Sequence, residues 1–229
     1  MKVLAIGAHP DDIEIFMYGL LSIFKKQGHE VFTMIATDGA KGGAISGKKL
    51  AIERVNEAIK GLEKLSSPIF LNLPDGDLGE VLEHRKIIKD SILNIMPDLI
   101  ITHSENDYHA DHKSLSLITK GAVSHYIPVL YCDTLMGINF NPNYYVDITD
   151  YYEFKKEAIL KHKTQKPNRF VDLFELMNSY RAAQCNSPKG KYAEAYSFVP
   201  SFPFSDIREI LPPPLKLRQF HIKDQNGFL

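Results

Sequence analysis

Residues 2–12, with the sequence KVLAIGAHPDD, decide how the chain begins to fold. The first six of them, Lys2–Gly7, form a short apolar run rich in β-forming residues, which is typical of a buried strand. From Asp11 to Lys26 apolar side chains recur at helical spacing, and Gly28 follows where a helix would end. The stretch therefore predicts a strand that passes directly into a helix, with His9 and two aspartates at the junction.

Strands and helices are expected to alternate along the rest of the chain. The sequence predicts strands at residues 30–37, 68–71, 98–102, 129–132 and 144–148, and helices at about 48–64, 82–96, 111–125, 151–162 and 168–184. Parallel strands need crossover connections, usually helices, so this order predicts an α/β fold. We expect a doubly wound, mostly parallel sheet with helices on both faces.

Composition and charge exclude several classes of protein. Of the 229 residues, 44% are hydrophobic and 24% are charged, which excludes a disordered chain. The 27 basic and 28 acidic residues leave a net charge of −1, so no overall field would attract nucleic acid or an anionic membrane. No apolar run has the length of a membrane span or the form of a signal peptide. We therefore expect a cytoplasmic protein with no nucleic-acid partner and no membrane insertion.

The character of the chain changes after Val199. Prolines such as Pro203 and Pro213 prevent a long helix, while apolar residues such as Phe204 and Ile207 are too frequent for a solvated linker. We expect a single catalytic domain over residues 1–198. Residues 199–229 are expected to form an extended, proline-rich arm, packed on its own domain or on a neighbouring subunit, and not a separate domain.

Two clusters of ionisable residues follow two of the predicted strands. His9, Asp11 and Asp12 come directly after the first strand, and residues 103–112 come directly after the fourth. In a doubly wound sheet these two strands flank the point where the strand order reverses, and ligands bind at the carboxyl ends of the strands there. Both clusters are therefore expected to meet at one crevice.

The residue types and spacings at this crevice suit a metal ion. His9 and Asp12 are three residues apart where strand gives way to helix, and His109 and His112 have the same spacing. A catalytic zinc accepts imidazole nitrogen and carboxylate oxygen, with three protein ligands and water at the fourth position. We expect one Zn²⁺ per chain, with His9, Asp12 and His112 as its ligands.

Three residues then remain for catalysis. Asp11 adjoins a ligand and is expected to accept the proton of the attacking water, whose pKa a zinc ion lowers. His109 is expected to polarise a carbonyl, stabilise the oxyanion and protonate the leaving amine. Asp111 is expected to orient His109 and favour its charged form. This chemistry hydrolyses an amide or an ester.

Each of these residues also has a simpler interpretation. Asp11, Asp12 or Asp111 could cap a helix, and a lone histidine could lie in a solvated loop. Gathering six ionisable side chains at two strand ends is unfavourable unless a metal or a substrate pairs them, which favours the site. The histidines without partners in sequence are expected at the surface, namely His29, His84, His125, His162 and His221.

The two clusters resemble the LmbE/PIG-L family of zinc-dependent N-acetylglucosaminyl deacetylases. The resemblance runs from residue 1 to about 198 and includes Thr37-Asp38-Gly39, Arg54 with Glu57, Pro74-Asp75-Gly76 and Tyr192–Tyr196. It implies a Rossmann-like fold, zinc on the same three ligands, the same catalytic roles, and homo-oligomers, which are frequent in the family. Ala110 stands where the family usually has proline, and the proline-rich arm has no counterpart there.

The expected function is removal of the acetyl group from an N-acetylated amino sugar or its conjugate. Zinc-bound hydroxide, formed with Asp11, would attack the acetamide and release acetate and a free amine. Arg54, Glu57 and Glu194 are candidate sugar contacts or supports for the residues of the site, and their simpler interpretation is ordinary charge on a helix surface. Two alternatives stay open, a metal-dependent phosphoesterase and a catalytically inactive protein that binds a sugar or a nucleotide.

Overall fold

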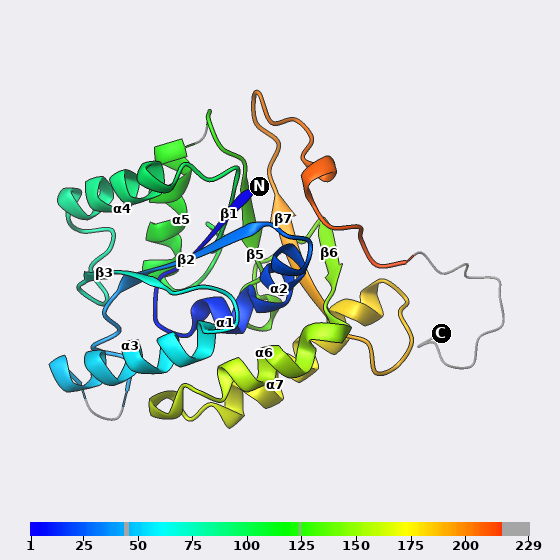
Figure 1. Ribbon diagram of the computed structural model, residues 1–229, viewed down its shortest axis with the longest axis horizontal. Coiled ribbons are helices and arrows are strands. Elements are labelled where there is room, and N and C mark those ends of the chain that lie inside the picture. The colour runs from blue at the N-terminus through cyan, green and yellow to red at the C-terminus, as the bar shows by residue number, and fades with distance from the viewer. Residues whose placement is uncertain (44–45, 124, 217–229) are drawn as a thin grey trace.

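The computed structural model describes residues 1–43, 46–123 and 125–216, and a mixed sheet lies at its centre (Figure 1). Within these residues the sheet has seven strands in the order β3-β2-β1-β4-β5-β7-β6. The strands are β1 (Lys2–Gly7), β2 (Glu30–Thr37), β3 (Ile69–Leu73), β4 (Leu99–Thr102), β5 (Val129–Cys132), β6 (Tyr144–Asp147) and β7 (Ala193–Phe198). The protein thus has the expected Rossmann-like α/β fold.

The strand order reverses beside β1, as expected for a doubly wound sheet. Val3 is in register with Val31 of β2 on one side and with Leu99 of β4 on the other, and both pairings are parallel. The carboxyl ends of β1 and β4 therefore lie next to each other and open the crevice that such a fold provides for a ligand.

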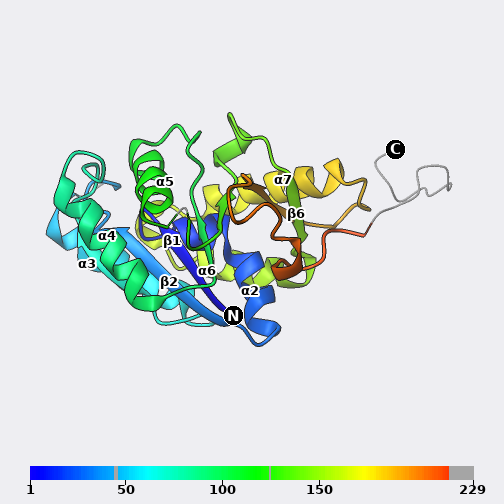
Figure 2. The same cartoon turned by 90° about the horizontal axis from the view of Figure 1, so that it is seen from above.

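Helices cover both faces of the sheet (Figures 1 and 2). Alternate side chains of β1 point to opposite faces, so Val3 and Ala5 pack in one apolar core while Leu4 and Ile6 pack in another. The first core includes residues of α1 (Asp12–Phe16), α2 (Tyr18–Lys26), α3 (Lys48–Leu62), α6 (Tyr152–Ile159) and α7 (Asn168–Gln184). The second includes residues of α4 (Leu82–Ile95) and α5 (Ala110–Val123).

The structure differs from the sequence prediction at one strand and one helix. β7 was not predicted, and it inserts between β5 and β6 in antiparallel pairing with both. The helix predicted from Asp11 to Lys26 is broken at Met17 into α1 and α2. The break lets the first backbone N–H groups of α2, at Gly19 and Leu20, donate to the buried carboxylate of Glu194 on β7.

The described part of the proline-rich arm, residues 199–216, packs on the same chain (Figure 1). Ile207 is buried in the first core, and the partly buried side chains of Phe204 and Leu211 pack against that core. The hydroxyl of Tyr144 on β6 donates to the carbonyl of Pro212. The end of the arm, including His221, lies outside the described residues. None of the helices in the described part of the chain combines the length and the apolar character that a membrane span requires.

Candidate metal and catalytic site

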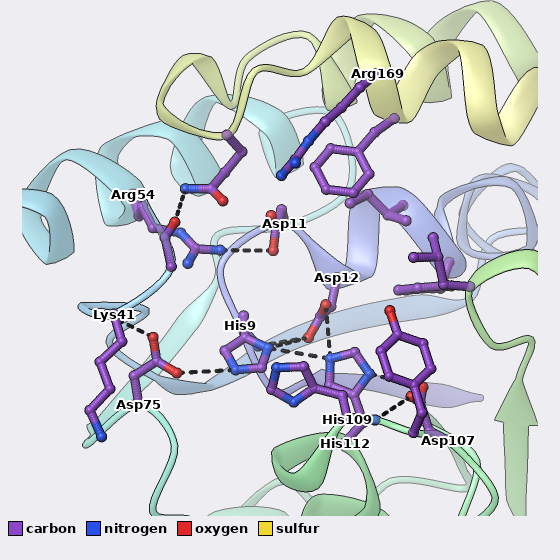
Figure 3. A pocket seen from close by; sticks show the side chains of 17 residues that line it. His9, Asp11, Asp12, Lys41, Arg54, Asp75, Asp107, His109, His112 and Arg169 are labelled. Atoms are coloured by element: carbon purple, nitrogen blue, oxygen red, sulfur yellow. Dashed lines mark hydrogen bonds and ion pairs between the residues drawn. The ribbon is translucent and has the colours of Figure 1, made fainter. Parts of the chain in front are cut away.

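The loop after β1 presents the first group of site residues (Figure 3). His9 and Asp12 flank a turn in which the Asp12 carboxylate accepts the backbone N–H of His9 at 2.7 Å. Asp11, between them in the sequence, has a φ of 150°, which is sterically unfavourable for a residue with a Cβ. The loop therefore holds the two aspartates in a strained but hydrogen-bonded arrangement at the carboxyl end of β1.

The three predicted zinc ligands converge in the structure. His9 Nδ1 lies 3.4 Å from Asp12 Oδ2 and 3.3 Å from His112 Nε2, and His112 Nε2 lies 3.4 Å from Asp12 Oδ1. All three side chains are buried. Ligand atoms bound tetrahedrally to zinc at 2.0–2.1 Å would be separated by about 3.3–3.4 Å. The two imidazole nitrogens have this separation, and Asp12 approaches each of them with a different carboxylate oxygen, so the donor set fits a zinc ion.

Carboxylates hold both histidine rings from their outer sides. Asp107 Oδ2 lies 2.9 Å from His112 Nδ1, while Asp111 Oδ2 and Asp75 Oδ1 lie 3.2 and 3.3 Å from His9 Nε2. Such contacts orient a metal-binding imidazole and make it more basic. Asp75 and Asp107 were not among the predicted site residues.

The contacts of Asp111 differ from the sequence prediction, which paired it with His109. Its carboxylate contacts His9 and accepts the backbone N–H groups of Gly76, at 2.7 Å, and Leu78, at 3.3 Å. The turn after β3 supplies these donors, so it draws the carboxylate away from His109. The Nδ1 atom of His109 instead accepts the backbone N–H of Asp111 at 3.3 Å.

Asp11 and Arg54 form a buried ion pair beside the predicted ligands. Arg54 Nη2 lies 3.0 Å from Asp11 Oδ1 and also donates to the carbonyl of Pro10, while Nη1 donates to the carbonyl of Gly39. Burial raises the pKa of Asp11, and Arg54 opposes this shift only in part. The Asp11 carboxylate is therefore a stronger base than an exposed aspartate.

The ring nitrogens of the site differ in their affinity for protons. Burial opposes protonation of His112, but Asp12 and Asp107 raise its pKa to about 9. Burial lowers the pKa of His103, whose ring stacks on His112 with centroids 3.7 Å apart, to about 4. Burial and the neighbouring His112 also lower the pKa of His109. His109 thus gives up a proton readily.

A cavity of about 360 Å³ opens beside this cluster (Figure 3). His9, Asp11, Asp12, Arg54, His109 and His112, six of the predicted site residues, line it. The segment before α7 and the first turn of that helix add Gln165, Arg169 and Phe170 from the other side. The site therefore combines side chains that could hold a metal ion, a buried carboxylate with a raised pKa and an open cavity.

Comparisons with known proteins bear on this arrangement. The profile of the family described as PIG-L, GlcNAc-PI de-N-acetylase, matches residues 4–123. The chain belongs to this family. Diacetylchitobiose deacetylase of Thermococcus kodakarensis is 30% identical over 225 residues, which cover 87% of this chain and 83% of that protein. The PIG-L family is a family of deacetylases, so this chain is assigned to the deacetylases at the level of its family.

Solved structures share the fold of this PIG-L family member. The N,N'-diacetylchitobiose deacetylase from Pyrococcus horikoshii has a TM-score of 0.76 and 25% identity, and the match covers 86% of this chain and 83% of that one. GalB, the 4-carboxy-2-hydroxymuconate hydratase from Pseudomonas putida KT2440, has a TM-score of 0.77 at 19% identity, over 90% of this chain and 99% of that one. The second likeness concerns the fold alone.

Two of the predicted substrate contacts lie outside the cavity in this PIG-L family member. Glu57 accepts the backbone N–H and the hydroxyl of Thr164, at 2.9 and 2.6 Å, and so holds the segment before α7. Glu194 is buried and pairs with Lys155 at 2.8 Å in addition to capping α2. Both carboxylates therefore hydrogen-bond or pair with groups of the protein itself and do not face the cavity.

Two histidines expected at the surface are buried. His162 lies with its Nε2 atom 2.8 Å from Glu14 Oε1, and His84 contacts the carbonyl of Asp77. No local pattern in the sequence marks the pairing of His162, because 148 residues separate it from Glu14. No local pattern in the sequence marks Gln165, Arg169 and Phe170 either, because they reach the cavity only through the packing of α7 and of the segment before it.

Proposed function

We propose that this protein is a zinc-dependent amidohydrolase that removes the acetyl group from an N-acetylated amino sugar or its conjugate. The observation that carries the proposal is the convergence of two imidazoles and a carboxylate at 3.3–3.4 Å, beside the buried base Asp11. Membership of a deacetylase family supports it, and so does the likeness to two deacetylases named for diacetylchitobiose.

His9, Asp12 and His112 would hold the metal ion. When bound, Zn²⁺ supplies Lewis acidity to an acetamide carbonyl and lowers the pKa of a bound water. Asp107 and Asp111, together with Asp75, fix the planes of the two imidazole rings, so that the facing nitrogens keep their positions. In this proposal Asp111 contacts the ligand His9 and does not orient His109; burial and His112 lower the pKa of His109, and the charge of Asp111 opposes that shift.

Asp11 would accept the proton of the attacking water. Its carboxylate is buried in the cavity wall, and burial raises its pKa, which strengthens it as a base. The contact of Arg54 with Oδ1 fixes the carboxylate plane and leaves Oδ2 as the oxygen available to a water. Arg54 is therefore proposed as a residue that positions the base.

His109 would donate a proton to the leaving amine. Its ring centroid lies 4.7 Å from that of His9 and 4.6 Å from that of His112, so it borders the ligand cluster. Burial and His112 lower the pKa of His109, so its ring is a strong acid once it carries a proton, and over the cycle the proton that Asp11 takes from the water would replace the one that His109 gives to the amine. Hydrolysis would then yield acetate and a neutral or protonated amine.

The cavity volume of about 360 Å³ is near the lower end of the range for ligand sites, roughly 300–1,000 Å³, and suits a sugar-sized substrate. We propose residues 1–198 as the catalytic unit, with the arm as an accessory to it.

The test is acetate release from a panel of N-acetylated amino sugars. The native protein is expected to release acetate, a chelator to abolish the activity, and added zinc to restore it. Asp11→Asn is expected to bind one zinc ion per chain and to release no acetate. The matched control, Glu105→Gln, removes one carboxylate from the loop that carries His109 without touching the cavity, and it should keep full activity.

Three outcomes would overturn the proposal. They are acetate release that persists in the chelator, full activity of Asp11→Asn, and phosphate release from phosphate esters by a protein that binds two metal ions per chain.

A further inference from the structure

One cation in the cavity wall has no acidic partner. Three basic side chains line the cavity, and two of them have carboxylates nearby, since Arg54 contacts Asp11 at 3.0 Å and Lys41 Nζ lies 3.6 Å from Asp77. Among the described residues, Arg169 forms no ion pair. Arg169 is an exposed residue that lines the cavity, so its charge is available to a group that enters the cavity.

The place of Arg169 in its helix does not favour a cation. Arg169 lies in the first turn of the 17-residue α7, which contains no acidic residue in that turn. The amino end of a helix carries a partial positive charge, so an arginine there is repelled by the dipole. The helix dipole therefore does not account for an arginine at this position, and the position inside the cavity wall points to a role toward a ligand.

The guanidinium of Arg169 is oriented by the next residue. Its Cζ atom lies 4.6 Å from the ring centroid of Phe170, which also lines the cavity. Stacking on an aromatic ring restrains the guanidinium plane, and a restrained guanidinium can donate two parallel hydrogen bonds to a carboxylate or a phosphate. Lysine would supply a charge but not this paired geometry.

Of the four acidic side chains that line the cavity, Asp11 is paired with Arg54, and the other three lie on another side of the cavity from Arg169. Asp12, Asp75 and Asp107 cluster around the histidines, while Arg169 extends from α7 toward the cavity interior on the side away from His109 and His112 (Figure 3). An anionic group on a substrate would be repelled near the aspartates and attracted near Arg169. The distribution of charge thus separates an end for the acetamide from an end for an anion.

We propose that Arg169 selects substrates that carry a carboxylate or a phosphate on the part of the molecule remote from the acetamide. This inference rests on the proposed function and names the substrate class of the same site. The sugar would lie with its acetamide at His9, Asp12 and His112 and its anionic substituent at Arg169.

The test uses matched derivatives of N-acetylglucosamine. The neutral methyl glycoside is compared with a carboxymethyl glycoside, with the 1-phosphate and 6-phosphate, and with a cationic aminoethyl glycoside. The measured quantity is the ratio of kcat/KM for each charged substrate to kcat/KM for the methyl glycoside. For the native protein we expect at least one anionic substrate to be preferred by about fivefold to tenfold, and we expect the preference to fall at high salt.

Variants of Arg169 then test the residue itself. Arg169→Gln should abolish the preference, Arg169→Lys should keep part of it, and Arg169→Glu should shift it toward the aminoethyl glycoside. The control Lys163→Gln removes the same charge from an exposed position close by that does not line the cavity, and it should keep the native ratio. A gain of activity toward the cationic substrate cannot come from loss of folding. Whichever of the carboxylate or the phosphates shows the preference identifies the anion.

Binding measurements separate this inference from the proposed function. Calorimetry with zinc-loaded Asp11→Asn compares the affinities of the same derivatives without turnover, and with Arg169→Gln added. If no derivative releases acetate but the anions still bind more tightly through Arg169, the proposed function is wrong and the inference stands. Equal affinities and equal ratios for anionic and neutral derivatives, or the same change in Lys163→Gln as in Arg169→Gln, would overturn the inference.

Discussion

Asp107 Oδ2 lies 2.9 Å from Nδ1 of His112, and this contact leaves Nε2 of the same ring facing His9 and Asp12. Asp107 is itself buried and also accepts the backbone N–H of His109 at 2.9 Å. One carboxylate thus fixes the imidazole plane of a proposed ligand and the backbone that carries a proposed acid.

Asp107→Asn is expected to weaken zinc binding. The amide keeps the size of the side chain but removes the charge that makes His112 a better ligand, so the loss should be about 10-fold to 100-fold. Competition with a chromophoric chelator measures the affinity. Glu105→Gln, which loses only the exposed ion pair with Lys120, is the control and should bind zinc as the native protein does. If Asp107→Asn bound zinc as tightly as the native protein, the proposal that Asp107 orients His112 would be wrong.

Zinc and protons are expected to compete at His112. Asp12 and Asp107 overcome the effect of burial and raise the pKa of His112 to about 9 in the metal-free protein, so this ring is protonated at neutral pH. Burial also opposes protonation of His9, but Asp111, Asp12 and Asp75 raise its pKa well above the usual value. Zinc must displace the protons of both rings, and the affinity should therefore rise with pH by up to about tenfold per pH unit for each ring that is protonated. Calorimetry in two buffers of different ionisation enthalpy counts the protons released. Zinc binding with no proton release between pH 6 and 8 would contradict this expectation.

Glu194→Gln is expected to destabilise the fold without altering substrate binding. The substitution leaves Lys155 buried without its counter-charge, and breaking such a pair costs about 3–5 kcal/mol. Urea unfolding gives the change in free energy, and Glu175→Gln on the exposed side of α7 is the control. If Glu194 contacted substrate instead, the variant would raise KM and leave the unfolding free energy unchanged.

The buried pair of His162 and Glu14 is expected to make stability depend on pH. Burial disfavours protonated His162, but Glu14 raises its pKa above the usual value of about 6.5. The stabilisation is therefore complete below the unfolded-state pKa and is lost as pH rises through the raised folded-state pKa. The difference in unfolding free energy between the native protein and His162→Gln should shrink as pH increases above 6.5. His125→Gln, at an exposed position, should show no such trend.

The parallel half of the sheet was predictable because its strands are short and apolar. The five strands from β1 to β5 lie within two residues of their predicted ranges. β7 escaped prediction because its strand character depends on partners, since Glu194 is stable in a strand interior only with Lys155 and the first N–H groups of α2 beside it. The break at Met17 has the same origin, for α2 begins where Glu194 can cap it.

The site was predictable where its residues are close in sequence. The spacings of His9 with Asp12 and of His109 with His112 placed all four at the crevice, because the carboxyl ends of β1 and β4 are adjacent. Contacts between distant segments were not accessible in this way. The carboxylate of Asp111 contacts His9 and not His109 because the turn after β3 supplies two N–H groups that it accepts. Arg169 lines the cavity only because α7 packs beside it.

The position of β7 also sets an order for folding during synthesis. Among the described strands β6 pairs with β7 and not with a parallel strand, and β7 ends at Phe198. A growing chain can therefore pair β1 to β5 early, but the outer edge of β5 stays open until the residues up to Phe198 have left the ribosome. A nascent protein paused before β7 would present an unpaired strand edge to other chains, so the last strand to emerge is the one that protects the sheet.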